Sequence, residues 1–144
     1  MLQKISHGRV LELRFDRPPA NAFNHALLSA LIEAIEAAPG EGAEGLVISG
    51  SPGLFSGGLD VPTLLTLDRE GVLATWGAFM QVCARLAACP IPVVAALTGH
   101  SPAGGAVISL FADYRVMARA GEKGPYRIGL NETAIGLALP QIGI

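Results

Sequence analysis

The chain has 144 residues, of which 51% are hydrophobic and 15% are charged, a balance that is typical of a folded globular domain and excludes a disordered protein. Its formal charge of −2 comes without a basic cluster, which argues against a nucleic-acid partner, and no apolar stretch is long enough to cross a bilayer as a helix. The first residues alternate polar and apolar side chains and do not resemble a secretory signal, so we expect one domain, residues 1–144, in the cytoplasm.

The first part of the chain predicts a strand, a helix and a second strand. Residues 9–16 alternate apolar and polar side chains, as a half-buried strand does, and two prolines end the pattern. Asn24 is a suitable cap for a helix that a Pro-Gly pair ends at residues 39–40. The apolar stripe of this helix consists of Leu27, Leu28, Leu31, Ile32 and Ile35. The short apolar run at residues 46–48, bounded by glycine and proline, predicts a fully buried strand.

Helices and strands continue to alternate along the rest of the chain. Residues 72–88 predict a second helix, and residues 93–97, which are small, β-branched and apolar, predict a strand covered on both faces. The side of this helix that we expect to face the core carries Leu73, Trp76, Phe79, Met80, Cys83 and Leu86. A third helix is expected at residues 106–112, a strand at residues 114–118 and an exposed loop at residues 121–124. This repeated order predicts a layered α/β fold with right-handed crossovers.

Two glycine-rich turns are the first candidates for chemistry. Residues 55–60 and residues 102–105 each follow a buried strand, and glycine lets the backbone approach a ligand closely. Two such turns can offer a pair of N–H groups to a negatively charged oxygen, with Gly104 as the donor at the start of the third helix. Alternatively, the glycines simply make tight turns between strands and helices. Neither turn has the spacing of a dinucleotide or P-loop site, which excludes nucleotide hydrolysis.

A mechanism also needs a group that can transfer a proton. Glu132 lies in an uncharged stretch, residues 128–137, and burial there would raise its pKa and suit it to act as a base. The alternative is an exposed or helix-capping glutamate, and composition alone does not decide between the two.

Other reactive side chains have structural explanations. Asp60 ends the first glycine turn and Asp113 ends the third predicted helix, and both are expected to cap or tie loops. His100 lies beside the second glycine turn and is expected to shape a pocket wall, because no Ser-His-Asp spacing is evident. Cys83 and Cys89 are expected to be core thiols. The three histidines have no metal-ligand spacing, so no metal is predicted.

The two glycine turns, taken together, resemble a known family. The sequences Phe-Ser-Gly-Gly-Leu-Asp at 55–60 and Gly-His-Ser-Pro-Ala-Gly-Gly at 99–105 are similar to the two signature segments of the crotonase (enoyl-CoA hydratase/isomerase) superfamily. The resemblance extends from the first strand, through Ala-Asn-Ala-Phe-Asn at 20–24, to residue 140. It implies a crotonase-like spiral of ββα units. Full members of the family are much longer and carry C-terminal helices that form trimers and cover the acyl pocket, so we expect that helical region to be missing here.

The resemblance also implies a site for an acyl-CoA thioester. The N–H groups of Leu59 and Gly104 match those that hold the thioester oxygen, and Glu132 matches the single catalytic base of delta-3,delta-2-enoyl-CoA isomerases. The implied substrate contacts come from Ala20, Ala22, Ser56, Gly57, Gly58, Asp60 and Gly105. Coenzyme A is then part of the substrate, and no separate cofactor is expected.

One departure from the family pattern narrows the reaction. Family hydratases use two glutamates, and Val107 occupies the position of the first. Water addition needs both activation of water and protonation of carbon, whereas one base suffices to move a double bond. The sequence therefore predicts an isomerase that converts a 3-enoyl-CoA into a 2-trans-enoyl-CoA in fatty-acid β-oxidation. The alternatives are an enoyl-CoA hydratase, another crotonase reaction such as thioester hydrolysis or decarboxylation, and a non-catalytic acyl-CoA-binding fragment.

Overall fold

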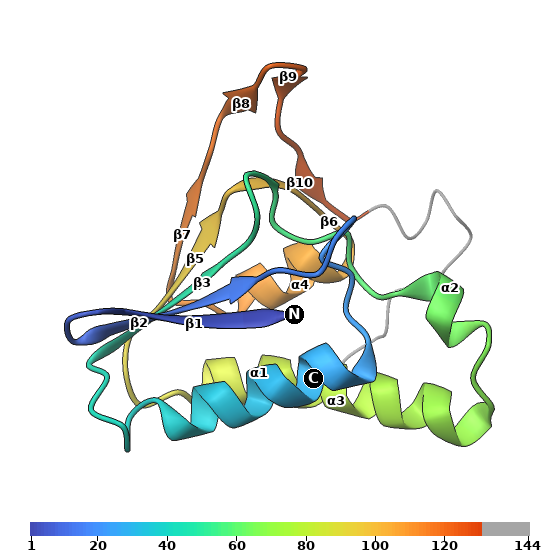
Figure 1. The fold of residues 1–144 in the computed structure, drawn as a ribbon, viewed down its shortest axis with the longest axis horizontal. Helices are drawn as coiled ribbons and strands as arrows, with labels where there is room; N and C mark the ends of the chain where they lie inside the picture. The colour runs from blue at the N-terminus through green and yellow to red at the C-terminus, as the bar shows by residue number, and fades with distance from the viewer. Residues whose placement is uncertain (131–144) are drawn as a thin grey trace, which may run out of the picture.

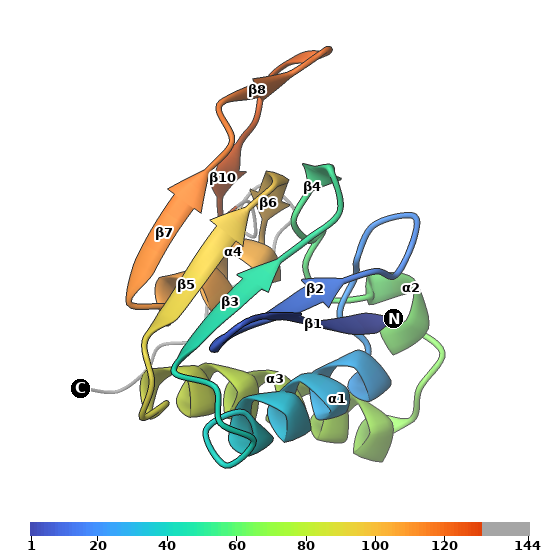
Figure 2. The same cartoon turned by 60° about the vertical axis from the view of Figure 1, so that its left-hand side comes forward.

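The computed structural model describes residues 1–130, so Glu132 lies outside the described residues. A five-stranded sheet has two long helices side by side against one face (Figure 1). A hairpin projects beyond the end of this sheet, as the turned view in Figure 2 shows. Within residues 1–130, no helix combines the length and the apolar character needed to cross a membrane.

The larger sheet has the strand order β1-β2-β3-β5-β7. Its strands are β1 (Leu2–His7), β2 (Val10–Phe15), β3 (Gly45–Ser49), β5 (Val93–Leu97) and β7 (Tyr114–Met117). Only the pair of β1 and β2 is antiparallel, and the three remaining pairs are parallel. The four predicted strands are thus confirmed, whereas β1 was not expected.

Parallel neighbours need crossover connections, and helices fill them here. The helices are α1 (His25–Ala37), α2 (Val61–Leu64), α3 (Arg69–Ala87) and α4 (Gly104–Leu110). The third predicted helix therefore starts inside the second glycine turn, two residues earlier than expected. The loop expected at residues 121–124 is instead the tip of a hairpin formed by β8 (Ala120–Gly121) and β9 (Gly124–Pro125).

A second, smaller sheet pairs the short strands that follow the long ones. It consists of β4 (Gly53–Leu54), β6 (Gly99–Pro102) and β10 (Ile128–Gly129), all parallel, in the order β10-β6-β4. Two successive units, β3 with β4 and β5 with β6, thus give one strand to each sheet before a helix begins. This is the spiral of ββα units, so the α/β class and the crotonase-like fold are confirmed.

The two long helices pack against each other beneath the sheet. Asn24 caps α1 as predicted, because its side chain accepts a hydrogen bond from the N–H of Leu27 at 2.9 Å. The buried face of α1 consists of Leu27, Leu28, Leu31, Ala34 and Ile35. Asp68 caps α3 in the same way, accepting from the N–H of Gly71 at 2.8 Å, so this helix begins earlier than the expected residue 72.

The face of α3 that we predicted to be buried is only partly correct. Phe79, Cys83 and Leu86 are buried, but Leu73, Trp76 and Met80 are 60%, 40% and 37% exposed. The helix has apolar residues on two adjoining sides, and packing against α1 and the sheet selects the side that also carries Thr75, Ala78 and Val82. Hydrophobic periodicity alone cannot choose between two such sides.

An aromatic cluster joins the sheet to the loops that follow β2 and β4. Phe15 lies edge-on to both Phe23 and Phe55, with ring centroids 5.3 Å apart in each pair. Phe23 also lies 6.3 Å from the ring of Phe79 on α3. The first three rings are fully buried, so the two loops rest on one rigid base.

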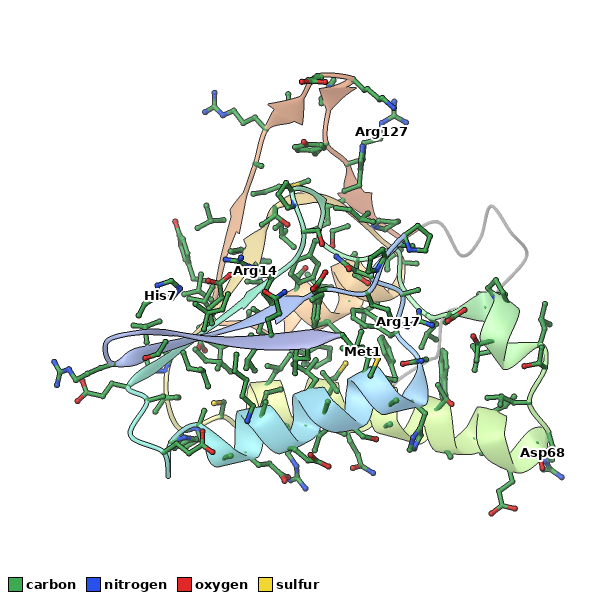
Figure 3. All side chains as sticks on the ribbon, viewed as in Figure 1. Met1, His7, Arg14, Arg17, Asp68 and Arg127 are labelled. Carbon is green, nitrogen blue, oxygen red and sulfur yellow. The ribbon has the colours of Figure 1, made fainter. Side chains whose placement is uncertain are left out.

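A buried carboxylate anchors the opposite face of the sheet. Glu12 on β2 is 7% exposed and accepts hydrogen bonds from Arg14, Ser49 and His7 (Figure 3 labels His7 and Arg14). Burial by itself raises the pKa of Glu12, but the bonds from Arg14, Ser49 and His7 outweigh it and lower that pKa to about 2.

We therefore expect Glu12→Gln to destabilise the protein at neutral pH. The drop in the Glu12 pKa from 4.5 to about 2 corresponds to roughly 3 kcal/mol of unfolding free energy. Because the folded-state pKa is depressed, this contribution is complete above pH 4.5 and is lost as the pH falls from there towards 2. Urea unfolding at a series of pH values between 2 and neutral measures this contribution. Glu44→Gln is the control, since that carboxylate pairs with Arg9 on the surface; equal effects of the two changes would contradict the prediction.

Candidate active site

The first glycine turn is hydrogen-bonded to the loop that follows β2. The N–H of Gly57 donates to the carbonyl of Ala20 at 2.8 Å. The hydroxyl of Ser56 donates to the carbonyl of Asn21 at 2.8 Å and accepts from the N–H of Gly58 at 3.1 Å. Ser56 is fully buried, so its hydroxyl serves the backbone of the turn.

Asn21 fastens the same two segments from the other side. Its side-chain amide donates to the carbonyls of Leu54 and Phe55, both at 3.2 Å, and its side-chain oxygen accepts from the N–H of Arg17 at 2.9 Å. Its φ of 47° is in the left-handed region, which asparagine tolerates better than most residues. Sequence reasoning did not single out this residue.

The N–H of Leu59 is left free by the way the turn pairs with Phe23. The N–H of Phe23 donates to the carbonyl of Gly58 at 2.7 Å, and the N–H of Asp60 donates to the carbonyl of Phe23 at 3.0 Å. In a trans peptide the N–H points opposite to the preceding C=O, so the N–H of Leu59 points away from Phe23. Within residues 1–130 it has no hydrogen-bond acceptor.

The second glycine turn lies beside the first because β6 pairs with β4. The turn leads directly into α4, whose first residue is Gly104, and the described residues offer no acceptor for the N–H of Gly104. The preceding residue, Ala103, has a φ of 49°, and its N–H donates to the carbonyl of Gly129 at 2.9 Å. The free N–H of Gly104 therefore sits on a firmly held backbone.

The two turns approach each other closely enough that side chains would not fit between them. A Cβ atom on Gly58 would lie 3.0 Å from the nitrogen of Gly104, and Gly58 has a φ of +90°. A Cβ atom on Gly104 would lie 3.4 Å from the nitrogen of Leu59 and 3.2 Å from the ring of Phe79. The predicted donors, Leu59 and Gly104, are thus brought together. Two unpaired N–H groups so placed can stabilise an oxygen that gains negative charge.

The remaining glycines of the turns allow the backbones to pack. A Cβ atom on Gly105 would lie 2.8 Å from the carbonyl oxygen of Ser56, and one on Gly57 would lie 3.3 Å from that of Ala20. Ala20 and Ala22 are half-buried, and their carbonyls accept hydrogen bonds from Gly57 and Arg17. Substrate contacts from these residues remain a prediction.

Asp60 is occupied by two internal partners. One carboxylate oxygen accepts from the N–H of Thr63 at 3.1 Å and caps α2, and the other pairs with Arg17 at 2.6 Å. Burial raises the pKa of Asp60, but the hydrogen bonds from Thr63 and Arg17 outweigh it and hold that pKa below its usual value. The expectation that Asp60 caps or ties a loop agrees with these contacts.

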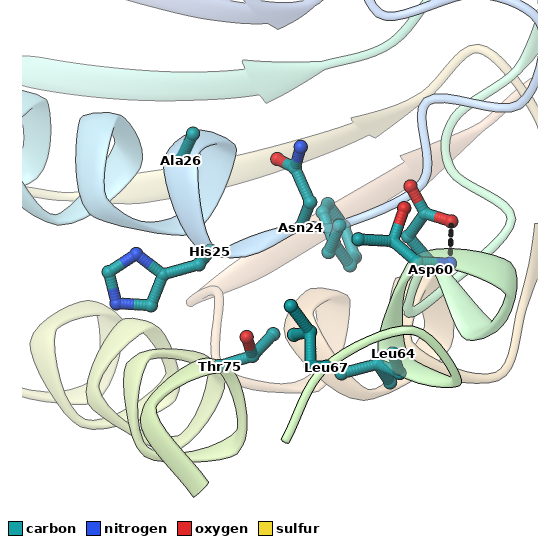
Figure 4. Close-up of a pocket in the computed structure, with 9 residues that line it drawn as sticks. Asn24, His25, Ala26, Asp60, Leu64, Leu67 and Thr75 are labelled. Carbon is teal, nitrogen blue, oxygen red and sulfur yellow. Dashed lines mark hydrogen bonds between the residues drawn. The ribbon is translucent and has the colours of Figure 1, made fainter. Parts of the chain in front are cut away.

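A pocket of about 290 Å³ adjoins the first glycine turn (Figure 4). It opens between the start of α1, α2 and α3, next to Leu59 in the chain because Asp60 forms part of its wall. The other lining residues are Phe23, Asn24, His25, Ala26, Thr63, Leu64, Leu67 and Thr75. Sequence reasoning did not identify this pocket, since its lining comes from three separate segments.

Other candidate side chains have structural contacts. Asp113 ties the start of β5, accepting from the N–H of Val93 at 2.7 Å. His100 is exposed, accepts from the N–H of Arg127 and packs edge-on against Tyr126, and it does not line the pocket in Figure 4. Val107 lies on α4 and packs against the core.

Neither cysteine has the environment of a reactive thiol. Cys83 is buried, and burial raises its pKa to about 11. Cys89 is half-buried against the core. In residues 1–130, no group of three or more histidine, cysteine, aspartate or glutamate side chains is arranged to hold a metal ion.

We expect Gly58→Ala to destabilise the protein by about 1–3 kcal/mol, because the new methyl group meets Gly104 and the backbone is left-handed there. Gly77→Ala is a matched control, since nothing lies within 4 Å of a Cβ atom at this position in α3. It should stabilise the helix by roughly 0.5–1 kcal/mol. Chemical unfolding of both variants measures the difference; a neutral Gly58→Ala would contradict the tight approach of the turns.

Comparison with known proteins agrees with this geometry. The family profile described as Enoyl-CoA hydratase/isomerase matches residues 6–144. The mitochondrial enoyl-CoA delta isomerase 1 of Homo sapiens is 32% identical over 133 residues, covering 91% of this chain and 43% of the human protein. The 2,3-dehydroadipyl-CoA hydratase of Escherichia coli (strain K12) is 35% identical over 131 residues, covering 90% of this chain and 49% of that protein.

A solved structure extends the similarity to three dimensions. The crystal structure of human mitochondrial delta3-delta2-enoyl-CoA isomerase superposes with a TM-score of 0.87 and 29% identity, covering 96% of this chain and 54% of that chain. The chain thus spans about half the length of the curated relatives that it matches. From its fold, its paired glycine turns and this match, the chain belongs to the enoyl-CoA hydratase/isomerase family.

Proposed function

We propose that the protein is an isomerase that moves the double bond of a 3-enoyl-CoA to give a 2-trans-enoyl-CoA, a reaction of fatty-acid β-oxidation. The observation that carries this proposal is the pair of N–H groups, on Leu59 and Gly104, that have no acceptor within residues 1–130 and lie on two turns in close contact. A thioester oxygen placed between them would receive two hydrogen bonds.

The proposed reaction needs one base and one oxyanion site. Glu132, as carboxylate, removes a proton from C2, and the electrons of that C–H bond pass into the thioester to form a dienolate. The N–H groups of Leu59 and Gly104 stabilise the negative charge on the oxygen, each contributing about 3 kcal/mol to the lowering of the barrier. The protonated Glu132 then returns the proton to C4, which completes the shift without a second acid or base.

The pocket beside the first turn supports an acyl substrate. Its walls combine apolar side chains, Phe23, Leu64 and Leu67, with the polar groups of Asn24 and Thr75. A hydrocarbon tail that leaves the thioester on this side would remove apolar surface from water. The loop that contains Ala20 and Ala22 lies on the first turn and is where we place the coenzyme A portion.

A hydratase is the second candidate, because a hydratase relative is as similar to this chain as the isomerase relatives are. Val107 favours the isomerase. It lies one helical turn after Gly104 on α4, where family hydratases are expected to carry a glutamate, and its apolar side chain cannot move a proton.

Replacing the proposed base should remove turnover and spare binding. We expect Glu132→Gln to lower kcat for a 3-enoyl-CoA by at least about 1,000-fold, since the proposed reaction assigns both proton transfers to this carboxylate. The affinity for a saturated acyl-CoA, measured by calorimetry, should stay unchanged. Glu122→Gln, in the exposed hairpin turn, is the control and should keep full activity. Undiminished turnover by Glu132→Gln would rule out Glu132 as the base.

Adding a carboxylate at position 107 should shift the reaction. We expect Val107→Glu to gain measurable hydration of a 2-enoyl-CoA, because a second group could then hold or transfer a proton. The decrease in the absorbance of the 2-enoyl-CoA measures this hydration. Val107→Gln controls for size and polarity and should gain nothing. Fast hydration by the unaltered protein would instead favour the hydratase.

A further inference from the structure

The ion pair between Arg17 and Asp60 lies next to the point where the backbones of Phe23 and Leu59 pair. Arg17 follows β2 and lies near the segment that leads into α2, as Figure 3 shows. Its guanidinium contacts Asp60 at 2.6 Å and also donates to the carbonyl of Ala22 at 3.0 Å. The two side chains are 27% and 11% exposed, far less than the surface pair of Arg9 and Glu44, at 77% and 57%.

The two groups that Arg17 contacts, Ala22 and Asp60, are sequence neighbours of Phe23 and Leu59. Ala22 directly precedes Phe23, and Asp60 directly follows Leu59. Phe23 and Leu59 are the residues whose backbones pair at this point. The guanidinium therefore links the residue before one partner to the residue after the other, and it does so with two N–H groups held in a fixed fork.

The carboxylate of Asp60 is mostly buried and is held by partners within the protein. Each of its carboxylate oxygens already accepts a hydrogen bond, one from Thr63 and one from Arg17, and the residue is 8% exposed. The geometry fits a group that acts through its neighbours.

We propose that Arg17 and Asp60 are a positioning pair that fixes the direction of the Leu59 N–H towards the substrate oxygen. The proposal rests on the oxyanion role given above to Leu59 and Gly104. The Phe23 hydrogen bonds set the plane of the peptide between Gly58 and Leu59, and the ion pair keeps the two segments from sliding apart. Hydrogen bonds weaken steeply as they bend, so a small rotation of this peptide would weaken the bond to the oxygen.

The test separates orientation from binding and from folding. Asp60→Asn keeps an oxygen to cap α2 but places an amide beside Arg17, and Arg17→Gln removes the guanidinium. A saturated acyl-CoA labelled with ¹³C at the thioester carbon is bound to each protein, and the ¹³C chemical shift reports how strongly the carbonyl is polarised. Turnover of a 3-enoyl-CoA gives kcat and KM, and chemical unfolding gives stability. Arg9→Gln, which breaks the surface pair, is the matched control.

We expect both variants to bind the labelled acyl-CoA as tightly as the unaltered protein. The change in the ¹³C chemical shift on binding, called the carbonyl shift below, should be mostly lost in both. Their kcat should fall by about 10-fold to 100-fold, less than the 10²–10³-fold cost of removing an oxyanion donor outright, with KM nearly unchanged. The double variant should lose no more than either single one, because both act through one contact. Arg9→Gln should change none of these values.

Three results would overturn the proposal. Weaker binding with the full carbonyl shift would make Asp60 or Arg17 a substrate contact. Lower stability with the shift and kcat intact would make the pair purely structural. If the ¹³C chemical shift of the thioester carbon did not change on binding to the unaltered protein, the Leu59 N–H would not be a donor to that carbonyl, and the pair would have nothing to orient. If the unaltered protein polarises the carbonyl but does not isomerise, the proposed reaction fails while the positioning pair stands.

Discussion

The pairing of Phe23 with the first glycine turn is the constraint on which the site depends. Because Phe23 takes the carbonyl of Gly58 and offers its own carbonyl to Asp60, the intervening N–H of Leu59 has to face the other way. The second turn lies on that side only because β6 pairs with β4 in parallel register. A local backbone pairing and a sheet register together create a pair of donors that neither turn contains alone.

Much of this arrangement could be predicted from the sequence, for reasons that are local. Asn24 and the leucine stripe of α1 specify a capped amphipathic helix, and the apolar runs in β3 and β5 specify buried strands. The glycines at 58 and 104 indicate where the backbone must turn or pack closely. The resemblance of their surroundings to the crotonase signature segments predicts Leu59 and Gly104 as the donors, and the structure brings these two residues together. These signals lie within a few residues of one another.

What could not be predicted depends on contacts between distant segments. β1 lies at the edge of the sheet and pairs only with β2, and two of its six residues are half-buried. The buried side of α3 was chosen by α1 and the sheet. The side chains of Asn21 and Arg17 form hydrogen bonds with residues more than 30 positions away, and the neighbouring sequence gives no signal of these bonds. The role of Glu132 stays a prediction, since it lies outside the described residues.

The close contact between main chains at the second sheet limits where such a protein can vary. A Cβ atom on Gly99 would lie 1.8 Å from the carbonyl carbon of Gly53, and one on Gly50 would lie 2.5 Å from the backbone of Phe55. Main-chain atoms cannot change rotamer to make space, so a side chain at either glycine would force the backbone to move. The pocket can instead change size through the side chains of α2 and α3 that line it, while the main-chain contacts between the two glycine turns stay as they are.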